Sequence, residues 1–207
     1  MKNQEKLWDL EYSKHNVKWK KERVNFPRVF KNKSVLEVGV GNGKNIPFIL
    51  SQKPSTFVAM DISDKAIKLC KDKYSKDKIE FLKEDFLNSN FKSKSFDIIL
   101  FYFVLNNMKE KDRDKAVSLA KKLLRKGGLV LFEDFAEGDV RQSNSKKIIE
   151  SNTIERKDGI ICHFFTKKEV RDLFSDFKKA NISERSSKIS KKDNSSLRKT
   201  ITAEIAN

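Results

Sequence analysis

The sequence has no apolar run of the roughly 20 residues that a membrane span needs, so we expect no membrane-spanning helix. Residues 1–8 are charged and lack the apolar centre of a signal peptide. The chain has two cysteines, Cys70 and Cys162, and they form neither a close pair nor a metal-ligand pattern. These absences lead us to expect a cytoplasmic protein with reduced thiols and no metal site.

Acidic residues are few relative to basic ones: 29 against 45, which gives a net charge of +16. Such an excess favours a polyanionic partner, and RNA or DNA is the usual one. The alternative is that a biased genome spread lysine along the whole chain without any partner. The charge alone leaves both interpretations open.

Charged residues make up 36% of the chain and hydrophobic residues 38%, but the apolar residues gather in separate runs. We therefore expect an ordered protein with a very polar surface, and 207 residues fit one domain. Residues 1–33 are expected to form a helical cap or lid, and residues 34–207 the domain itself. Residues 186–199, basic and rich in serine, are expected to form an exposed hairpin loop.

Apolar runs alternate with helical patterns, which predicts an α/β fold with a mostly parallel sheet and helices on both faces. Ser63 is a predicted helix cap, and Thr166 with Glu169 has capping-box spacing. A third helix is expected to end at Lys126-Gly127-Gly128. Seven strands are predicted, at residues 34–40, 56–60, 79–82, 96–105, 129–132, 180–187 and 199–205.

The glycines Gly39, Gly41 and Gly43 stand at alternate positions where the first predicted strand ends. This spacing differs from the G-x-G-x-x-G of dinucleotide sites, and no Walker-type G-K-[ST] is present. A glycine turn can also be only a tight turn, but its place after a buried strand favours a ligand. Glu37 precedes the turn, and a carboxylate there favours a cationic ligand over a phosphate.

Two acids follow the next two predicted strands. Asp61, followed by Ile62, can accept hydrogen bonds from both hydroxyls of a ribose. Asp85 can accept one from an adenine amino group, with Phe86 beside the ring. The alternatives are a helix N-terminal acid for Asp61 and an ordinary polar turn for Asp85. The carboxyl ends of adjacent strands are where an open α/β sheet binds its ligands.

Together these motifs resemble those of class I S-adenosylmethionine-dependent methyltransferases, over roughly residues 34–135. The resemblance implies a Rossmann-like sheet whose last strand is antiparallel, and S-adenosyl-L-methionine as cofactor. The segments that carry it are Val35–Gly43, Asp61, Glu84-Asp85-Phe86, Phe96–Ile99 and Leu124–Leu131.

Further segments are similar to motifs of the tRNA 3-methylcytidine methyltransferases, which implies an RNA substrate and, more narrowly, tRNA. They are Trp8–Lys14, Trp19–Arg23, Phe103–Leu105, Val130–Phe135, Arg156–Gly159 and Phe164–Thr166. With this resemblance, the predicted cofactor contacts are Trp8, Tyr12, Glu37, Gly39, Gly41, Asp61, Ile62, Asp85, Phe86 and Tyr102. Trp8 and Tyr12 are four residues apart, so they share a helical face that either packs on the domain or closes over the cofactor.

Methyl transfer to N3 of cytosine needs no strong base, because the N3 lone pair is free. The product is a cation, which a carboxylate stabilises. Asp134 is the first catalytic candidate, with Asn106 behind it, although Asp134 can equally be a strand-end acid. Leu105-Asn106-Asn107-Met108 stands where exocyclic-amine methyltransferases carry D/N-P-P-Y/F. A small-molecule methyltransferase, or a cofactor-binding subunit that needs a partner protein, remains an alternative.

Overall fold

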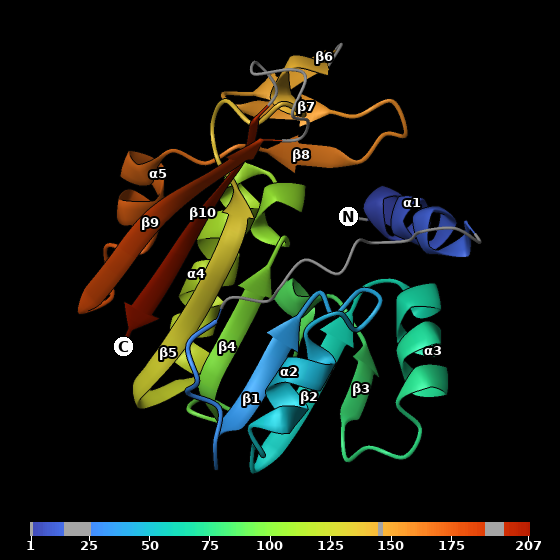
Figure 1. The fold of residues 1–207 in the computed structure, drawn as a ribbon, viewed down its shortest axis with the longest axis vertical. Coiled ribbons are helices and arrows are strands. Elements are labelled where there is room, and N and C mark those ends of the chain that lie inside the picture. The colour runs from blue at the N-terminus through green and yellow to red at the C-terminus, as the bar shows by residue number, and fades with distance from the viewer. Residues whose placement is uncertain (1, 15–25, 145–146, 189–196) are drawn as a thin grey trace.

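The computed structural model describes residues 2–14, 26–144, 147–188 and 197–207. Their main feature is a seven-stranded sheet in the order β3-β2-β1-β4-β5-β10-β9 (Figure 1). Strands β1 to β5 run parallel, and β10 is antiparallel to both of its neighbours. The predicted α/β fold with an antiparallel last strand is confirmed. The strands are β1 (Ser34–Val38), β2 (Thr56–Asp61), β3 (Glu80–Lys83), β4 (Phe96–Tyr102), β5 (Leu124–Phe135), β9 (Lys179–Lys188) and β10 (Leu197–Ala206).

Helices cover both faces of the sheet because the central strands are apolar on both sides; every residue of β1 is buried. α2 (Ile46–Ser51) and α3 (Asp64–Lys73) pack on one face through an apolar cluster that includes Ile49 and Ile67. α4 (Glu110–Leu123) and α5 (Lys167–Leu173) pack on the other. The predicted caps are confirmed: Ser63 Oγ accepts from the Ala66 N–H, and Thr166 Oγ1 from the Glu169 N–H.

The expected helix end at Lys126-Gly127-Gly128 is wrong, because these residues lie inside β5. The backbone is already extended at Leu124, where α4 ends. Gly127, with φ 74°, lies where the pairing of β4 with β5 shifts register, and Gly128 O accepts a hydrogen bond from the Asn207 N–H. The fourth strand is also shorter than predicted, since β4 ends at Tyr102 and a 3-10 turn, η2 (Leu105–Asn107), follows.

A small second sheet was not predicted. Its strands are β6 (Lys147–Glu150), β7 (Thr153–Glu155) and β8 (Ile161–His163), in the order β6-β7-β8. Figure 1 shows this sheet above the carboxyl ends of β4 and β5, with α1 (Lys2–Ser13) beside it. It therefore stands over the edge of the main sheet at which the predicted site residues gather.

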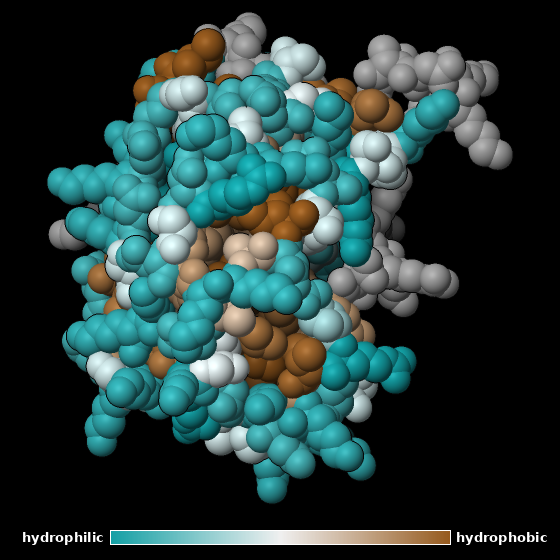
Figure 2. All heavy atoms as spheres, turned by 90° about the vertical axis from the view of Figure 1, so that its left-hand side faces the viewer, coloured by the Kyte–Doolittle hydropathy of each residue, from teal (hydrophilic) through white to brown (hydrophobic). Residues whose placement is uncertain are grey.

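The expected loop at residues 186–199 is partly strand, since β9 extends to Lys188 and β10 begins at Leu197. Its tip lies outside the described residues, as does the predicted motif Trp19–Arg23. Hydrophilic side chains cover most of the face shown in Figure 2, and apolar groups show only in patches. Among the described helices, none has both the length and the apolar character needed to span a membrane.

Candidate active site

The glycine turn after β1 has a backbone conformation that would be strained for any residue other than glycine. Gly39, Gly41 and Gly43 have φ values of 71°, 55° and 73°, in the left-handed region that favours glycine. A Cβ on Gly41 would lie 2.7 Å from Tyr12 Oη, and one on Gly39 would lie 2.5 Å from Val104 Cγ2. The turn therefore needs glycine both for its conformation and for the close approach of its neighbours.

Asp61 ends β2 beside this turn. Its Oδ2 accepts a hydrogen bond from the Gly41 N–H and its Oδ1 one from the Ser63 N–H, both at 2.9 Å. Burial raises the pKa of Asp61 to about 6, although the backbone hydrogen bonds act in the opposite direction. The two backbone donors hold the carboxylate at the strand end.

Asp85, at the end of the neighbouring strand β3, caps the 3-10 turn η1 (Phe86–Asn88). Its Oδ1 accepts from the Leu87 N–H at 3.1 Å and its Oδ2 from Asn88 Nδ2 at 2.8 Å. The alternative role as a turn acid is thus present in the structure. Asp85 nevertheless also lines a cavity at the ends of these strands.

A cavity of about 340 Å³ lies at the ends of these strands. Four acidic side chains and one lysine line it. The structure brings together here seven of the predicted cofactor contacts: Trp8, Tyr12, Gly39, Asp61, Ile62, Asp85 and Phe86. Residues that are far apart in the sequence thus form one acidic pocket.

Helix α1 forms one wall of this cavity and joins it to both sheets. Asp9 Oδ1 accepts hydrogen bonds from Ser63 Oγ at 2.6 Å and from the Lys65 N–H at 3.2 Å, at the start of α3. On the other side, Gln4 Nε2 donates to Gly159 O at 3.1 Å, in the turn between β7 and β8. The Trp8 and Tyr12 rings stack with centroids 5.7 Å apart and line the cavity. This placement fits a helix that covers a bound ligand, and the closing motion stays a prediction.

A second cavity, of about 790 Å³, adjoins the first. Both are lined by Trp8, Tyr12, Gly39, Phe103 and Asn107. The predicted contacts Gly41 and Tyr102 and the catalytic candidate Asn106 also line this cavity. Five cations line it, and no acid does so within the described part of the chain: Lys44, Arg141, Arg156, Lys157 and Arg198.

Two predicted site residues, Glu37 and Asp134, line neither cavity among the described residues. Glu37 lies buried beneath the glycine turn, where its Oε1 accepts from Asn45 Nδ2 at 2.7 Å and its Oε2 has no described partner. Burial, with a smaller contribution from the charge of Asp61, raises the pKa of Glu37 to about 8. The glycine turn, with the acid Asp61 beside it and the unpartnered Oε2 of Glu37 beneath it, fits the ribose-bearing cofactor that the resemblance implies.

Glu37 makes the stability of the protein depend on pH. Its pKa is raised from 4.5 to about 8, so its stabilising contribution is complete below pH 4.5 and is lost as the pH rises to about 8. We expect the free energy of unfolding to fall by roughly 3–5 kcal/mol relative to Glu37→Gln over this range, at about 1.4 kcal/mol per pKa unit. Urea unfolding at pH 5 to 8 measures it. The exposed Glu80→Gln is the control, and parallel pH curves for Glu37→Gln and wild type would contradict the prediction.

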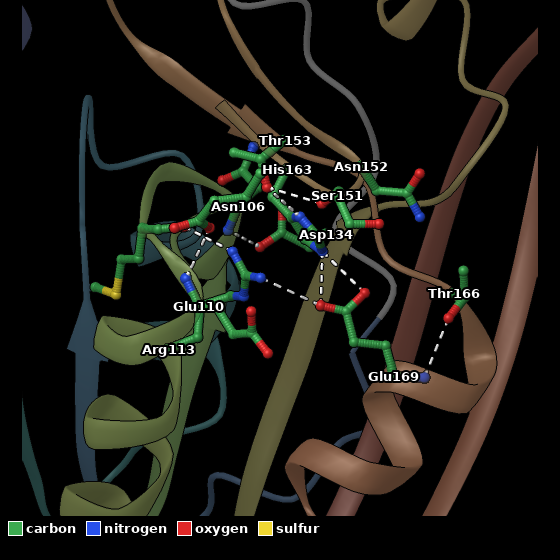
Figure 3. A network of polar contacts seen from close by, with 12 residues as sticks. Asn106, Glu110, Arg113, Asp134, Ser151, Asn152, Thr153, His163, Thr166 and Glu169 are labelled. Atoms are coloured by element: carbon green, nitrogen blue, oxygen red, sulfur yellow. Dashed lines mark hydrogen bonds and ion pairs between the residues drawn. The ribbon is translucent and has the colours of Figure 1, made fainter. Parts of the chain in front are cut away.

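Asp134 is completely buried at the end of β5. Its Oδ2 accepts from the Asn106 N–H at 3.0 Å (Figure 3), and its Oδ1 accepts from the Phe135 N–H at 3.1 Å. Burial raises its pKa well above the usual range, although the two N–H groups and the charge of Arg113 lower it. The Asp134 side chain thus holds Asn106 in place. Asn106 lines the second cavity, and Asp134 does not.

Behind this pair, His163 has partners that the sequence did not reveal. Its Nε2 lies 2.7 Å from Glu169 Oε1, and its Nδ1 lies 2.8 Å from Thr153 Oγ1 (Figure 3). The imidazole thus lies between an acid and a hydroxyl group. His163 and Thr153 are both buried, however, and neither lines either cavity. The group joins the small sheet to α5 and to Arg113 of α4.

Sequence reasoning missed Phe103, Arg141 and Arg198 as site residues. Phe103 stands between the two cavities with φ 55°, a strained conformation for a large side chain, and strain of this kind gathers at functional sites. The Arg141 guanidinium lies 4.1 Å from the centroid of the Phe135 ring. The excess of basic residues was the one available signal, and it did not identify which of them meet.

Comparison with known sequences finds a match to a family model and similarity to curated relatives. Residues 36–132 match the family model of a methyltransferase domain. The chain is 30% identical over 194 residues to the tRNA N(3)-methylcytidine methyltransferase Mettl2 of Drosophila melanogaster, covering 82% of this chain and 60% of that protein. It is 29% identical over 196 residues to tRNA N(3)-methylcytidine methyltransferase trm140 of Schizosaccharomyces pombe, covering 84% and 64%. The chain therefore spans less than two thirds of these relatives.

Solved structures show the same fold. A SAM-dependent methyltransferase from Methanosarcina mazei superposes with a TM-score of 0.70 at 19% identity, covering 88% of this chain and 98% of that one. The N-methyltransferase NodS from Bradyrhizobium japonicum, solved with S-adenosyl-L-homocysteine, gives 0.61 at 16% identity, covering 84% and 78%. The resemblance drawn from the motifs is confirmed.

Proposed function

We propose that this chain, which belongs to the S-adenosylmethionine-dependent methyltransferases, transfers a methyl group to N3 of a cytidine in tRNA. The observation that carries the proposal is the opposite charge of two adjoining cavities. The first is lined by four acids and one lysine, and the second by five cations and no acid among the described residues. The first suits a cationic cofactor and the second a polyanionic acceptor.

The first cavity would hold the cofactor, which supplies an activated methyl group on a sulfonium. Asp61 would accept hydrogen bonds from the ribose hydroxyls, and Asp85 with Phe86 would contact the adenine. The glycine turn allows the backbone to approach the ligand closely. Trp8 and Tyr12 on α1 would exclude water, which favours displacement at a carbon centre.

The second cavity would hold the acceptor nucleotide. Arginine side chains bind phosphate groups through paired N–H donors, so Arg141, Arg156 and Arg198 are suited to an RNA backbone. Arg198 Nε is buried and has no hydrogen-bond partner among the described residues. A buried donor of this kind is satisfied when an anion enters. Part of the positive charge of the chain thus lines one cavity, a location that the composition alone does not indicate.

The reaction needs no general base, since N3 of a neutral cytosine already carries a free lone pair. Alignment and exclusion of water are the main contributions. Asn106, in the wall of the second cavity, would contact the acceptor base. Asp134 would act through Asn106, because its Oδ2 accepts the backbone N–H of that residue.

The test is transfer of a labelled methyl group to total tRNA and, in parallel, to a small-molecule extract, followed by nucleoside analysis. We expect label in tRNA as 3-methylcytidine, and tRNA affinity that falls steeply with rising salt. Replacing Arg198 by alanine should weaken tRNA binding about tenfold at low salt, while the exposed Arg171→Ala on α5 should change it little. Label only in the small-molecule extract, or none in 3-methylcytidine, would contradict the proposal.

A further inference from the structure

We propose that the side-chain amide oxygen of Asn106 accepts a hydrogen bond from the exocyclic amino group of the acceptor base, so that Asn106 selects cytidine. The inference rests on the proposed function and adds to it the group that reads the base. It is carried by three observations: an aromatic wall in the second cavity, an unpartnered amide oxygen beside it, and a carboxylate that joins the two.

The aromatic wall consists of Tyr102, Phe103 and Phe135, which all line the second cavity. The ring centroids of Tyr102 and Phe103 are 4.7 Å apart, and so are those of Phe103 and Phe135. Unpaired bases are commonly held by stacking on aromatic side chains. A wall of this kind holds a flat base without distinguishing one base from another, so selection requires a polar group at the base edge.

Asn106 provides that polar group. It lines the same cavity and is 2% exposed. Its Nδ2 lies 3.8 Å from Cys162 Sγ, whereas its Oδ1 is buried with no partner among the described residues. A buried acceptor without a partner is costly, and a ligand that donates a hydrogen bond removes the cost. The neighbouring Asn107 differs, because its Nδ2 already donates to Phe103 O at 2.9 Å.

Asp134 fixes the position of Asn106 relative to the aromatic wall. One carboxylate oxygen accepts a hydrogen bond from the Asn106 N–H (Figure 3), and the other accepts one from the Phe135 N–H. The residue that contacts the base edge and a ring that contacts the base face are thus held by one buried side chain. Asp134 is a positioning residue in this scheme, which accounts for its place outside the cavity.

The chemistry of the pyrimidines makes the acceptor oxygen selective. Cytosine carries an amino group at C4, next to the N3 that is methylated, and this group donates a hydrogen bond to an amide oxygen. Uracil has a carbonyl at the same position, so two acceptors would face each other. A site built to bond an amino group discriminates against a base that lacks it, because the oxygen of the site is then left unpaired.

The experiment measures binding of labelled RNA hexamers by fluorescence anisotropy, with S-adenosylhomocysteine present. The hexamers contain cytidine, uridine or zebularine, a pyrimidinone nucleoside that keeps the free N3 but lacks the amino group. We expect the wild type to bind the cytidine hexamer about tenfold more tightly than the zebularine hexamer, as for the loss of one hydrogen bond to a buried acceptor. In Asn106→Leu, which removes the amide at similar volume, this ratio should fall to about one.

Asn181→Leu, the same substitution at an exposed asparagine of β9 that lines neither cavity, is the matched control, and it should leave the ratio of cytidine to zebularine affinity unchanged. A ratio near one in the wild type, or a ratio retained in folded Asn106→Leu, would overturn the inference. If Asn106→Leu does not fold, the wild-type ratio and Asn106→Ala decide the question, and the ratio in Asn106→Ala should also fall to about one. The two proposals fail separately: a cytidine preference without methylation of tRNA contradicts only the proposed function, and methylation without the preference contradicts only the role of Asn106.

Discussion

Replacing Asp61 by asparagine is expected to weaken the binding of S-adenosylhomocysteine about 100-fold, as for the loss of one or two charge-assisted hydrogen bonds. Both carboxylate oxygens accept backbone N–H groups, from Gly41 and Ser63. An asparagine NH₂ group would therefore face one of these donors, while the charge that we propose attracts the ribose hydroxyls is lost. Isothermal titration calorimetry measures the affinity.

The control for this change is Asp64→Asn, an acid of the first turn of α3 that lines neither cavity. The same titration has a pH dependence. Because burial raises the pKa of Asp61 to about 6, the wild-type affinity should rise as the pH increases through about 6, and that of Asp61→Asn should not. Wild-type affinity in Asp61→Asn, or equal losses in both variants, would remove Asp61 from the cofactor site.

Replacing Arg113 by alanine is expected to lower the free energy of unfolding by about 3 kcal/mol, as for the loss of one partner of a buried charge pair. Arg113 is 3% exposed, and its guanidinium donates to Met108 O at 2.8 Å and to Glu169 Oε1 at 3.3 Å. Glu169 also lies 2.7 Å from His163 (Figure 3). Removing the arginine thus weakens the join of α4, α5 and the small sheet.

Urea unfolding measures this loss, and Arg125→Ala provides the comparison. Arg125 also pairs with an acid, Asp97, at 3.0 Å, but its side chain is 49% exposed. An exposed pair contributes roughly 0–1 kcal/mol, so this variant should be nearly as stable as the wild type. Equal losses in the free energy of unfolding in the two variants would contradict the prediction, because they would show that the buried Arg113 pair contributes no more than the exposed Arg125 pair.

The parts of the fold that could be predicted are those with a local pattern. The central strands are apolar runs that pack on both faces, and Ser63 and Thr166 cap helices through bonds to residues three positions later. The small sheet escaped prediction because β6, β7 and β8 have only four, three and three residues. Strands of that length are too short to show an alternation of apolar and polar residues.

The candidate site divides in the same way. Gly39, Gly41, Asp61 and Asp85 each lie at or just after the end of a predicted strand, and parallel strands bring such ends to one edge of the sheet. The basic residues of the second cavity have no such pattern. Arg198 stands near the start of β10 and Arg141 beyond the end of β5, and they come to one cavity because these strands pair antiparallel.

By itself the sequence determined the cofactor class, the succession of the main-sheet strands along the chain and the acids at their ends, because short-range patterns in the chain encode these features. Only the tertiary structure decided where the positive charge gathers, which of Asn106 and Asp134 reaches a cavity, and how α1 joins the two sheets. These features depend on contacts between segments far apart in the chain. No local pattern records such contacts, because they arise only when the segments pack together.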